Sequence, residues 1–156
     1  MSLHRLVYAS RIAPGTAAAL EPELDVILAA SVRNNRRAGL SGLLVAHDGW
    51  FFQALEGEPA AVSARYAVIA ADPRHTNARV LSQGAADRRL FEQWTMCARQ
   101  VSAWDAALLS VLRDSPAFRP EAGSATDVLR LLTTVGAVHK RALDDGHAAR
   151  LTRLAA

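Results

Sequence analysis

The fold of this chain is decided by residues 40–55, which read LSGLLVAHDGWFFQAL. The first part, LSGLLVA, is an apolar run, and the last part, WFFQAL, is a second run rich in aromatic residues. Asp48 and Gly49 lie between them, and an Asp-Gly pair between two such runs is typical of the tight turn in a β-hairpin. The stretch therefore predicts two adjacent antiparallel strands.

Outward from this hairpin, the sequence predicts helices and further strands on both sides. Residues 22–38 are expected to form a helix, because Pro22 suits a first helical turn and Gly39 suits a helix end. The other predicted elements are a first strand at 4–10, a second helix opened by Pro59 and ended by Asp72-Pro73, and strands at 78–83 and 93–101. The order β-α-β-β-α-β-β predicts an α+β fold, a ferredoxin-like mixed sheet with two helices on one face.

The C-terminal third has a different pattern, with two predicted helices and no further strand. Residues 103–113 are helix-like, and Ser124 can cap a helix that runs to about Leu143. The apolar stripe of this last helix could pack on the outer face of the sheet or on another subunit. We therefore divide the chain into a domain at 1–101 and a two-helix C-terminal extension at 102–156.

Composition excludes several classes of protein. Hydrophobic residues make up 51% of the 156 residues, enough for a core, and the single cysteine rules out an internal disulfide and a cysteine-rich zinc site. The five histidines lack metal-ligand spacing, so no metal is expected. The net charge of +3 comes from scattered basic residues, which does not favour nucleic acid as a partner. Without a signal peptide or an apolar run of ~20 residues, we expect a cytoplasmic protein with no membrane contact.

Polar residues stand where the strand pattern predicts a buried face. Phe51, Gln53 and Leu55 alternate along one strand and point to the same side. A buried amide without a partner costs about 1–3 kcal/mol, so Gln53 requires a hydrogen bond. If the first strand turns Tyr8 toward the helices, its hydroxyl lies in the same layer. A core glutamine bonded to backbone and a structural tyrosine explain these two residues equally well.

Similar alternatives apply to the other polar positions. Helical spacing places Ser31, Asn34 and Asn35 on the face that begins with Ile27, where the asparagines could simply cap the helix near its end. The residues after the second helix could belong to a solvated loop, and those of the last strand to the core. These positions are Asp72, Arg74 and His75 in the loop, and Trp94 and Met96 in the strand.

Taken together and in order, these stretches resemble the BLUF family, sensors of blue light using flavin. The matching stretches are RLVYAS at 5–10, SVRNNRRAGLSGLL at 31–44, DGWFFQALEG at 48–57, DPRH at 72–75 and RLFEQWTM at 89–96. No one motif decides the matter, but the ordered set over about residues 3–100 is specific.

The resemblance implies a flavin held between the two helices. It identifies Tyr8 with the redox-active tyrosine of the family and Gln53 with the glutamine between that tyrosine and the flavin ring. Asn35 corresponds to the asparagine at the polar edge of the ring, with Asn34 beside it. The resemblance also assigns Ile27, Ser31, Phe51 and Ile69 to the ring, Asp72, Arg74 and His75 to the ribityl chain and phosphate, and Trp94 and Met96 to the strand that relays the signal.

The implied function is that of a photoreceptor without substrate turnover. FAD is the expected cofactor, although FMN or riboflavin could fill the same ring site, and the output is expected to pass through a homo-oligomer or a separate downstream protein. Two alternatives are a small ferredoxin-like enzyme acting on phosphates and a regulatory binding module of the same fold. The sequence lacks an evident nucleophile or general base for the first, and the second needs a basic stripe with exposed aromatic residues.

Overall fold

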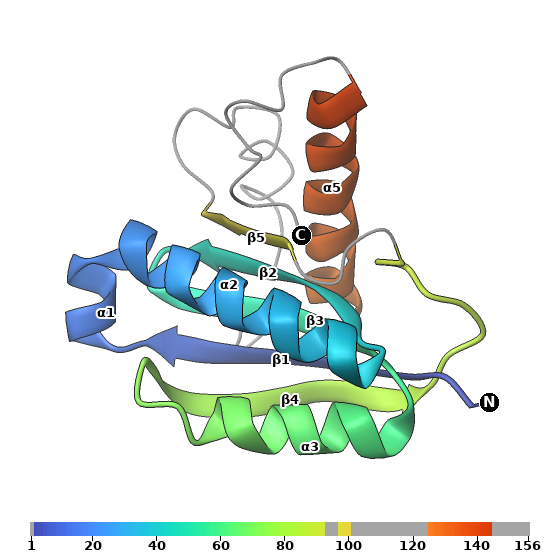
Figure 1. The fold of residues 1–156 in the computed structure, drawn as a ribbon. Coiled ribbons are helices and arrows are strands. Elements are labelled where there is room, and N and C mark those ends of the chain that lie inside the picture. Colours follow the sequence, from blue (N-terminus) through green and yellow to red (C-terminus); the bar gives the residue numbers. More distant parts are fainter. Residues whose placement is uncertain (1, 93–96, 101–124, 145–156) are drawn as a thin grey trace.

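The computed structural model describes residues 2–92, 97–100 and 125–144. The strands are β1 (His4–Ile12), β2 (Ser41–His47), β3 (Trp50–Gly57), β4 (His75–Ala85) and β5 (Cys97–Gln100). The helices are α1 (Pro14–Ala18), α2 (Leu20–Ala38), α3 (Pro59–Ala70) and α5 (Ala125–Asp144), all labelled in Figure 1.

The strands form one mixed sheet in the order β4-β1-β3-β2-β5. Among the strands that the structure describes, only β2 and β5 pair in parallel, and the predicted hairpin joins β2 to β3. Asp48 and Gly49 adopt positive φ angles of 49° and 80°, the backbone conformation that a two-residue type I′ turn requires. The predicted α+β fold with a mixed sheet is confirmed.

Two separate cores cover the two faces of the sheet. Helices α2 and α3 pack on the face that we call the front, and α5 packs on the back (Figure 1). Because successive residues of a strand point to opposite faces, β3 contributes Phe51 and Leu55 to the front core and Phe52 and Ala54 to the back core. The front core is built from Leu6, Tyr8, Ile12, Leu24, Leu28, Leu40, Leu44, Ala46, Phe51, Leu55 and Val62.

The apolar stripe of α5 packs on the sheet of the same chain. Val128, Leu131, Leu132 and Val135 are each at most 1% exposed and pack against the back of the sheet. The stripe is therefore buried within this chain rather than against another subunit. Among the described helices, none combines the length and apolar character needed to cross a bilayer.

The predicted boundaries differ from the structure near the first helix and at two strands. Pro14 begins the short helix α1, because a proline suits a first helical turn as well as it suits a loop. Helix α2 accordingly starts at Leu20. Strands β1 and β4 are longer than their apolar runs because they pair as far as Ile12 and His75. The predicted helix at 103–113 and the capping residue Ser124 lie outside the described residues.

Candidate functional site

A groove runs between α2 and α3 on the front of the sheet. Its cavity has a volume of about 140 Å³, and its walls carry both apolar and charged side chains. The lining residues are Tyr8, Ile27, Ala30, Ser31, Asn34, Leu44, Phe51, Gln53, Arg65, Val68, Ile69, Asp72, Arg74 and His75.

The two helical walls follow the same spacing. In α2 the lining residues are Ile27, Ala30, Ser31 and Asn34, at positions i, i+3, i+4 and i+7. In α3 and just beyond its end, Arg65, Val68, Ile69 and Asp72 repeat that spacing. Residues three and four apart form one stripe on a helix, so each helix presents a single stripe to the groove. The α2 stripe is apolar at its start and polar at its end, whereas the α3 stripe has two apolar residues between two charged ones.

The floor of the groove carries a buried pair of polar side chains. Tyr8 of β1 and Gln53 of β3 stand directly opposite each other in the antiparallel ladder. They are 2% and 3% exposed, and the Tyr8 hydroxyl donates a hydrogen bond of 2.5 Å to the Gln53 Oε1. The β1–β4 pairing is irregular on both sides of Tyr8, between Val7 and Tyr8 and again between Ala9 and Arg11. The sheet therefore brings this tyrosine and this amide together beneath the groove.

The surroundings of Tyr8 keep its phenol protonated. Burial raises the pKa of Tyr8 well above its usual value, and the negative charges that Tyr66 and Asp72 can carry add to the rise. The ring of Tyr66 lies 5.4 Å from that of Tyr8, centroid to centroid, in a tilted arrangement. Tyr8 is thus a neutral hydrogen-bond donor throughout the physiological pH range.

His75 fixes the end of the groove by two hydrogen bonds. Its Nδ1 lies 2.6 Å from the Ser10 Oγ, and its Nε2 bonds the backbone carbonyl of Ile69. Because a carbonyl only accepts, Nε2 carries a proton, and in the neutral ring Nδ1 accepts from the Ser10 hydroxyl. The imidazole also meets the rings of Tyr8 and Phe51 edge-on. His75 therefore ties β1 and β4 to the C-terminal end of α3.

The rim is crossed by a chain of charges. The Asp72 carboxylate accepts hydrogen bonds from the Arg74 backbone and guanidinium, the shortest 2.6 Å long. The hydrogen bond from the Arg74 side chain lowers the pKa of Asp72, and burial opposes this effect only in part. Arg74 also lies 3.9 Å from the Glu23 carboxylate of α2. Arg74 thus links the two helical walls at one end of the groove.

Arg65 lines the groove from α3. Its Nε is buried and has no hydrogen-bond partner within the part of the chain that the structure describes. A buried donor of this kind is costly unless something accepts its hydrogen bond. Arg65 is therefore the cation best placed for an anionic group of a ligand in the groove.

The structure brings nearly all of the predicted flavin contacts into this one groove. The exception is Asn35, which is 1% exposed but is not among the lining residues, and whose backbone carbonyl accepts a hydrogen bond from Leu40 at the end of α2. Its contact with a ring edge stays a prediction. Trp94 and Met96, the predicted relay residues, lie outside the described residues.

Four lining residues were not predicted from the sequence. They are Ala30, Leu44, Arg65 and Val68. The spacing back from Ile69 and Asp72 along α3 leads to Val68 and Arg65, so extending the helical stripe by one turn would have found both. Within the described residues, no group of three or more His, Cys, Asp or Glu side chains could hold a metal ion.

The sequence of this chain also matches the model of a known protein family. The family described as BLUF, sensors of blue-light using FAD, matches residues 3–97, which is more than half of the chain. The chain belongs to the BLUF family. It is therefore a domain of a family that senses blue light with a flavin.

Relatives of known sequence include photoactivated adenylate cyclase subunits. The alpha subunit from Euglena gracilis is 34% identical over 94 residues, which are 60% of this chain and 9% of the relative. The beta subunit from Euglena longa is 33% identical over 95 residues, 61% of this chain and 11% of the relative. The chain thus spans about a tenth of the length of the curated relatives that it matches.

Solved structures of BLUF proteins match over most of the chain. The photo-activated state of BlsA has a TM-score of 0.72 at 27% identity, covering 85% of this chain and 93% of BlsA. The dark state of BlrB has a TM-score of 0.69 at 25% identity, covering 86% of this chain and 97% of BlrB. A bacterial light-regulated adenylyl cyclase matches at a TM-score of 0.62 and 32% identity, covering 71% of this chain and 33% of the cyclase. The shared fold thus extends over more than nine-tenths of BlsA and of BlrB.

Proposed function

We propose that this BLUF domain signals through a light-driven change in the hydrogen bond between Tyr8 and Gln53. The observation that carries the proposal is the 2.5 Å bond from the Tyr8 hydroxyl to the Gln53 carbonyl oxygen, buried on the floor of the groove. The chain then acts as a switch between two hydrogen-bonded states and turns over no substrate.

The donor set of the groove fits a flavin. Ile27, Phe51 and Ile69 offer apolar surface for a flat ring, and Asn34 and Gln53 offer amides for its polar edge. Asn35 is assigned to the same edge on the strength of the family resemblance. The exposed Val68, 61% accessible at the groove, would be covered by a ligand seated there.

Arg65 favours a phosphorylated flavin. The guanidinium of Arg74 is already engaged by Asp72, whereas the buried Nε of Arg65 would gain a partner from a phosphate oxygen. We therefore propose FAD or FMN rather than riboflavin, with FAD favoured by the family.

Tyr8 is the electron donor in this mechanism. A bound flavin that has absorbed blue light supplies a strong oxidant for a nearby phenol. Tyr8 gives up an electron, and its proton moves along the existing hydrogen bond toward Gln53. Tyr8 holds this proton in the dark, and burial raises its pKa further above the neutral range. When the electron and proton return, Tyr8 is regenerated and no product leaves the site.

The change that persists after the electron and proton have returned lies in the hydrogen bonds of Gln53. A carboxamide both donates and accepts hydrogen bonds, so Gln53 can settle in a different orientation or tautomer after the proton has moved. In a water-poor groove each such bond is stronger than in bulk water, which makes the new arrangement metastable. A small red shift in flavin absorption would report the change, and the shift would decay in the dark.

The light-induced change must also be passed from this domain to another molecule. Neither a second domain nor a partner is needed for the photochemistry itself. We propose that the light state is conveyed through contacts between copies of the chain or to a separate protein.

Illumination of the purified protein and of two variants tests this function. The protein is expected to be yellow and to show a reversible red shift under blue light. Tyr8→Phe removes the electron and proton donor, and Gln53→Leu removes the amide, so each should abolish the red shift while flavin stays bound. Absorption spectra before and after illumination give the result directly.

The variant Arg36→Gln serves as a control, because Arg36 is exposed on α2 outside the groove. It should keep both flavin and red shift. An unaltered photocycle in Tyr8→Phe would remove the phenol from the mechanism, and a protein that takes up no added flavin would refute the function as a whole.

A further inference from the structure

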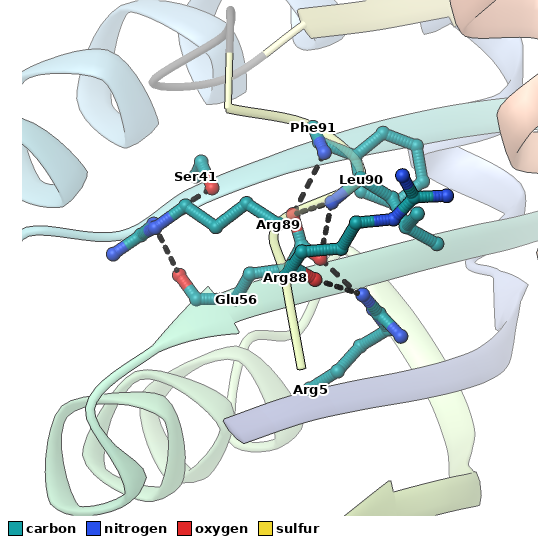
Figure 2. A network of polar contacts seen from close by, with 7 residues as sticks. All are labelled: Arg5, Ser41, Glu56, Arg88, Arg89, Leu90 and Phe91. Atoms are coloured by element: carbon teal, nitrogen blue, oxygen red, sulfur yellow. Dashed lines mark hydrogen bonds and ion pairs between the residues drawn. The ribbon is translucent and has the colours of Figure 1, made fainter. Parts of the chain in front are cut away.

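Glu56 is a fully buried carboxylate on the back of the sheet, away from the flavin groove. Its Oε1 accepts hydrogen bonds from the backbone N–H groups of Leu90 (3.0 Å) and Phe91 (2.8 Å). Its Oε2 accepts from the Arg5 Nε (2.9 Å) and from the Leu90 N–H (2.8 Å). Figure 2 shows these bonds converging on the one side chain. The carboxylate therefore joins β1 and β3 to the segment that leads from β4 toward β5.

Arginine side chains extend this junction across the sheet. Arg89 donates to the Ser41 Oγ (2.8 Å) and to the carbonyl oxygens of Glu56 (3.1 Å) and Gly39 (2.8 Å), while Arg5 donates to the Arg88 carbonyl (2.7 Å). We call this cluster of Arg5, Ser41, Glu56, Arg89 and the backbone of residues 88–91 the latch (Figure 2). Arg5, Glu56 and Ser41 face one another on β1, β3 and β2. The latch therefore spans three neighbouring strands.

The latch also holds the residue that meets α5. Phe91 is 1% exposed and packs in the back core with Val128, Leu131, Leu132 and Val135 of α5. Its backbone N–H is one of the donors to Glu56. A displacement of residues 88–91 would therefore move a side chain that shares the back core with α5.

The photochemical pair and the latch belong to the same ladder. Tyr8 pairs with Gln53, and three residues along, Arg5 pairs with Glu56. At ~3.3 Å per residue the two pairs are ~10 Å apart along β1 and β3. A shift of β1 relative to β3 at Tyr8 and Gln53 would therefore also displace Arg5 relative to Glu56, on the opposite face of the sheet.

We propose that Glu56 is the positioning residue that couples the Tyr8–Gln53 switch to α5, through its bonds to the backbone of Leu90 and Phe91. This inference rests on the proposed function. It assigns the output route to the back of the sheet and to a side chain that contacts neither the groove nor the flavin.

The test compares light-dependent hydrogen exchange in the full-length, flavin-loaded protein and in Glu56→Gln. The Leu90 N–H is shared by both carboxylate oxygens, so whichever way the new amide is turned, its NH₂ faces Leu90 and one further donor, either Phe91 or Arg5. Two of the four bonds are lost in either orientation, and exchange at Leu90 should speed up by about tenfold or more in the dark. Illumination should change exchange in residues 125–144 of the unaltered protein, and this change should shrink severalfold in Glu56→Gln while the flavin red shift is kept.

Glu58→Gln is the matched control, because Glu58 is exposed two residues further along and should behave like the unaltered protein. If Glu56→Gln does not fold, Arg5→Gln replaces it, since that change keeps the backbone bonds to Glu56 and should give a partial loss. An α5 response that persists unchanged in the variant used overturns the coupling, and so does its absence in an unaltered protein that shows the red shift. An unaltered protein with no red shift refutes the proposed function instead, and with it the coupling.

Discussion

The two faces of the sheet are built from the same strands but do different work. On the back, the core residues of β1, β2 and β3 are all apolar and α5 closes over them, with Glu56 at one end. On the front, β1 and β3 carry Tyr8 and Gln53 among apolar neighbours, and α2 and α3 leave a groove above them. The proposed switch therefore lies beneath a groove between two helices, whereas a single helix packs over the apolar centre of the back face.

Adjacent phenylalanines in β3 offer the sharpest test of this difference. Phe52 is 0% exposed in the back core, so Phe52→Ala leaves a cavity that its neighbours cannot fill, and it should lower the free energy of unfolding by about 3–5 kcal/mol. Phe51 lines the groove, so Phe51→Ala enlarges an existing space and should cost less, while shifting the flavin absorption. Urea unfolding of the flavin-free proteins and absorption spectra of the loaded proteins give the two readouts.

Equal losses of stability in the two flavin-free variants would contradict this difference, because they would mean that Phe51 is packed as tightly as Phe52. Phe51→Leu provides a control that keeps most of the apolar volume. It should restore stability more fully than it restores the spectrum.

Local patterns in the sequence were enough to predict the sheet and the floor of the site. The alternation in residues 50–55 assigned Gln53 and its neighbours to one face, and the Asp48-Gly49 turn joined β2 to β3 as expected. Period-two alternation and turn chemistry are properties of a few consecutive residues, so they can be read from the sequence without knowing the tertiary contacts. Tyr8 could be placed in the same layer only conditionally, because its facing depends on strand pairing.

Long-range contacts account for what the sequence could not predict. Glu56 bonds residues 34 to 51 positions away in the chain, with Arg5 on one side and Leu90 and Phe91 on the other. No spacing rule connects such positions. Arg65 was missed for a different reason, since an arginine on a helix is ordinarily a solvated residue and only the groove shows that its Nε is buried. The packing of α5 likewise could not be predicted, because it depended on which face of the sheet α2 and α3 leave uncovered.

Arg65 provides the next prediction, on the front face alone. Arg65→Gln removes a charge-assisted hydrogen bond of about 1.5–3 kcal/mol, so FMN and FAD should bind about ten- to a hundredfold more weakly, while riboflavin binding is unchanged. Fluorescence titration of flavin-free protein with the three flavins measures this. Arg36→Gln should leave all three affinities intact, and an equal loss for riboflavin would show that Arg65 contacts the ring rather than a phosphate.

The smallest effect is expected at the rim, where Asp72 and Arg74 are only partly buried. Arg74 lowers the pKa of Asp72 in the folded protein, below the value of about 3.9 that an aspartate has in an unfolded chain. A lowered folded pKa means that the unfolded chain binds the proton more readily, so the pair stabilises the fold fully above that value and loses its contribution as the pH falls through the folded pKa. Partly exposed pairs of this kind contribute less than about 1 kcal/mol. Urea unfolding at pH 7 and pH 3 should therefore show a slightly smaller acid-induced loss in Asp72→Asn than in the unaltered protein. A large difference between the two would mean that the rim is as tightly organised as the latch on the opposite face, and the contrast between a loosely held front and a firmly tied back would fail.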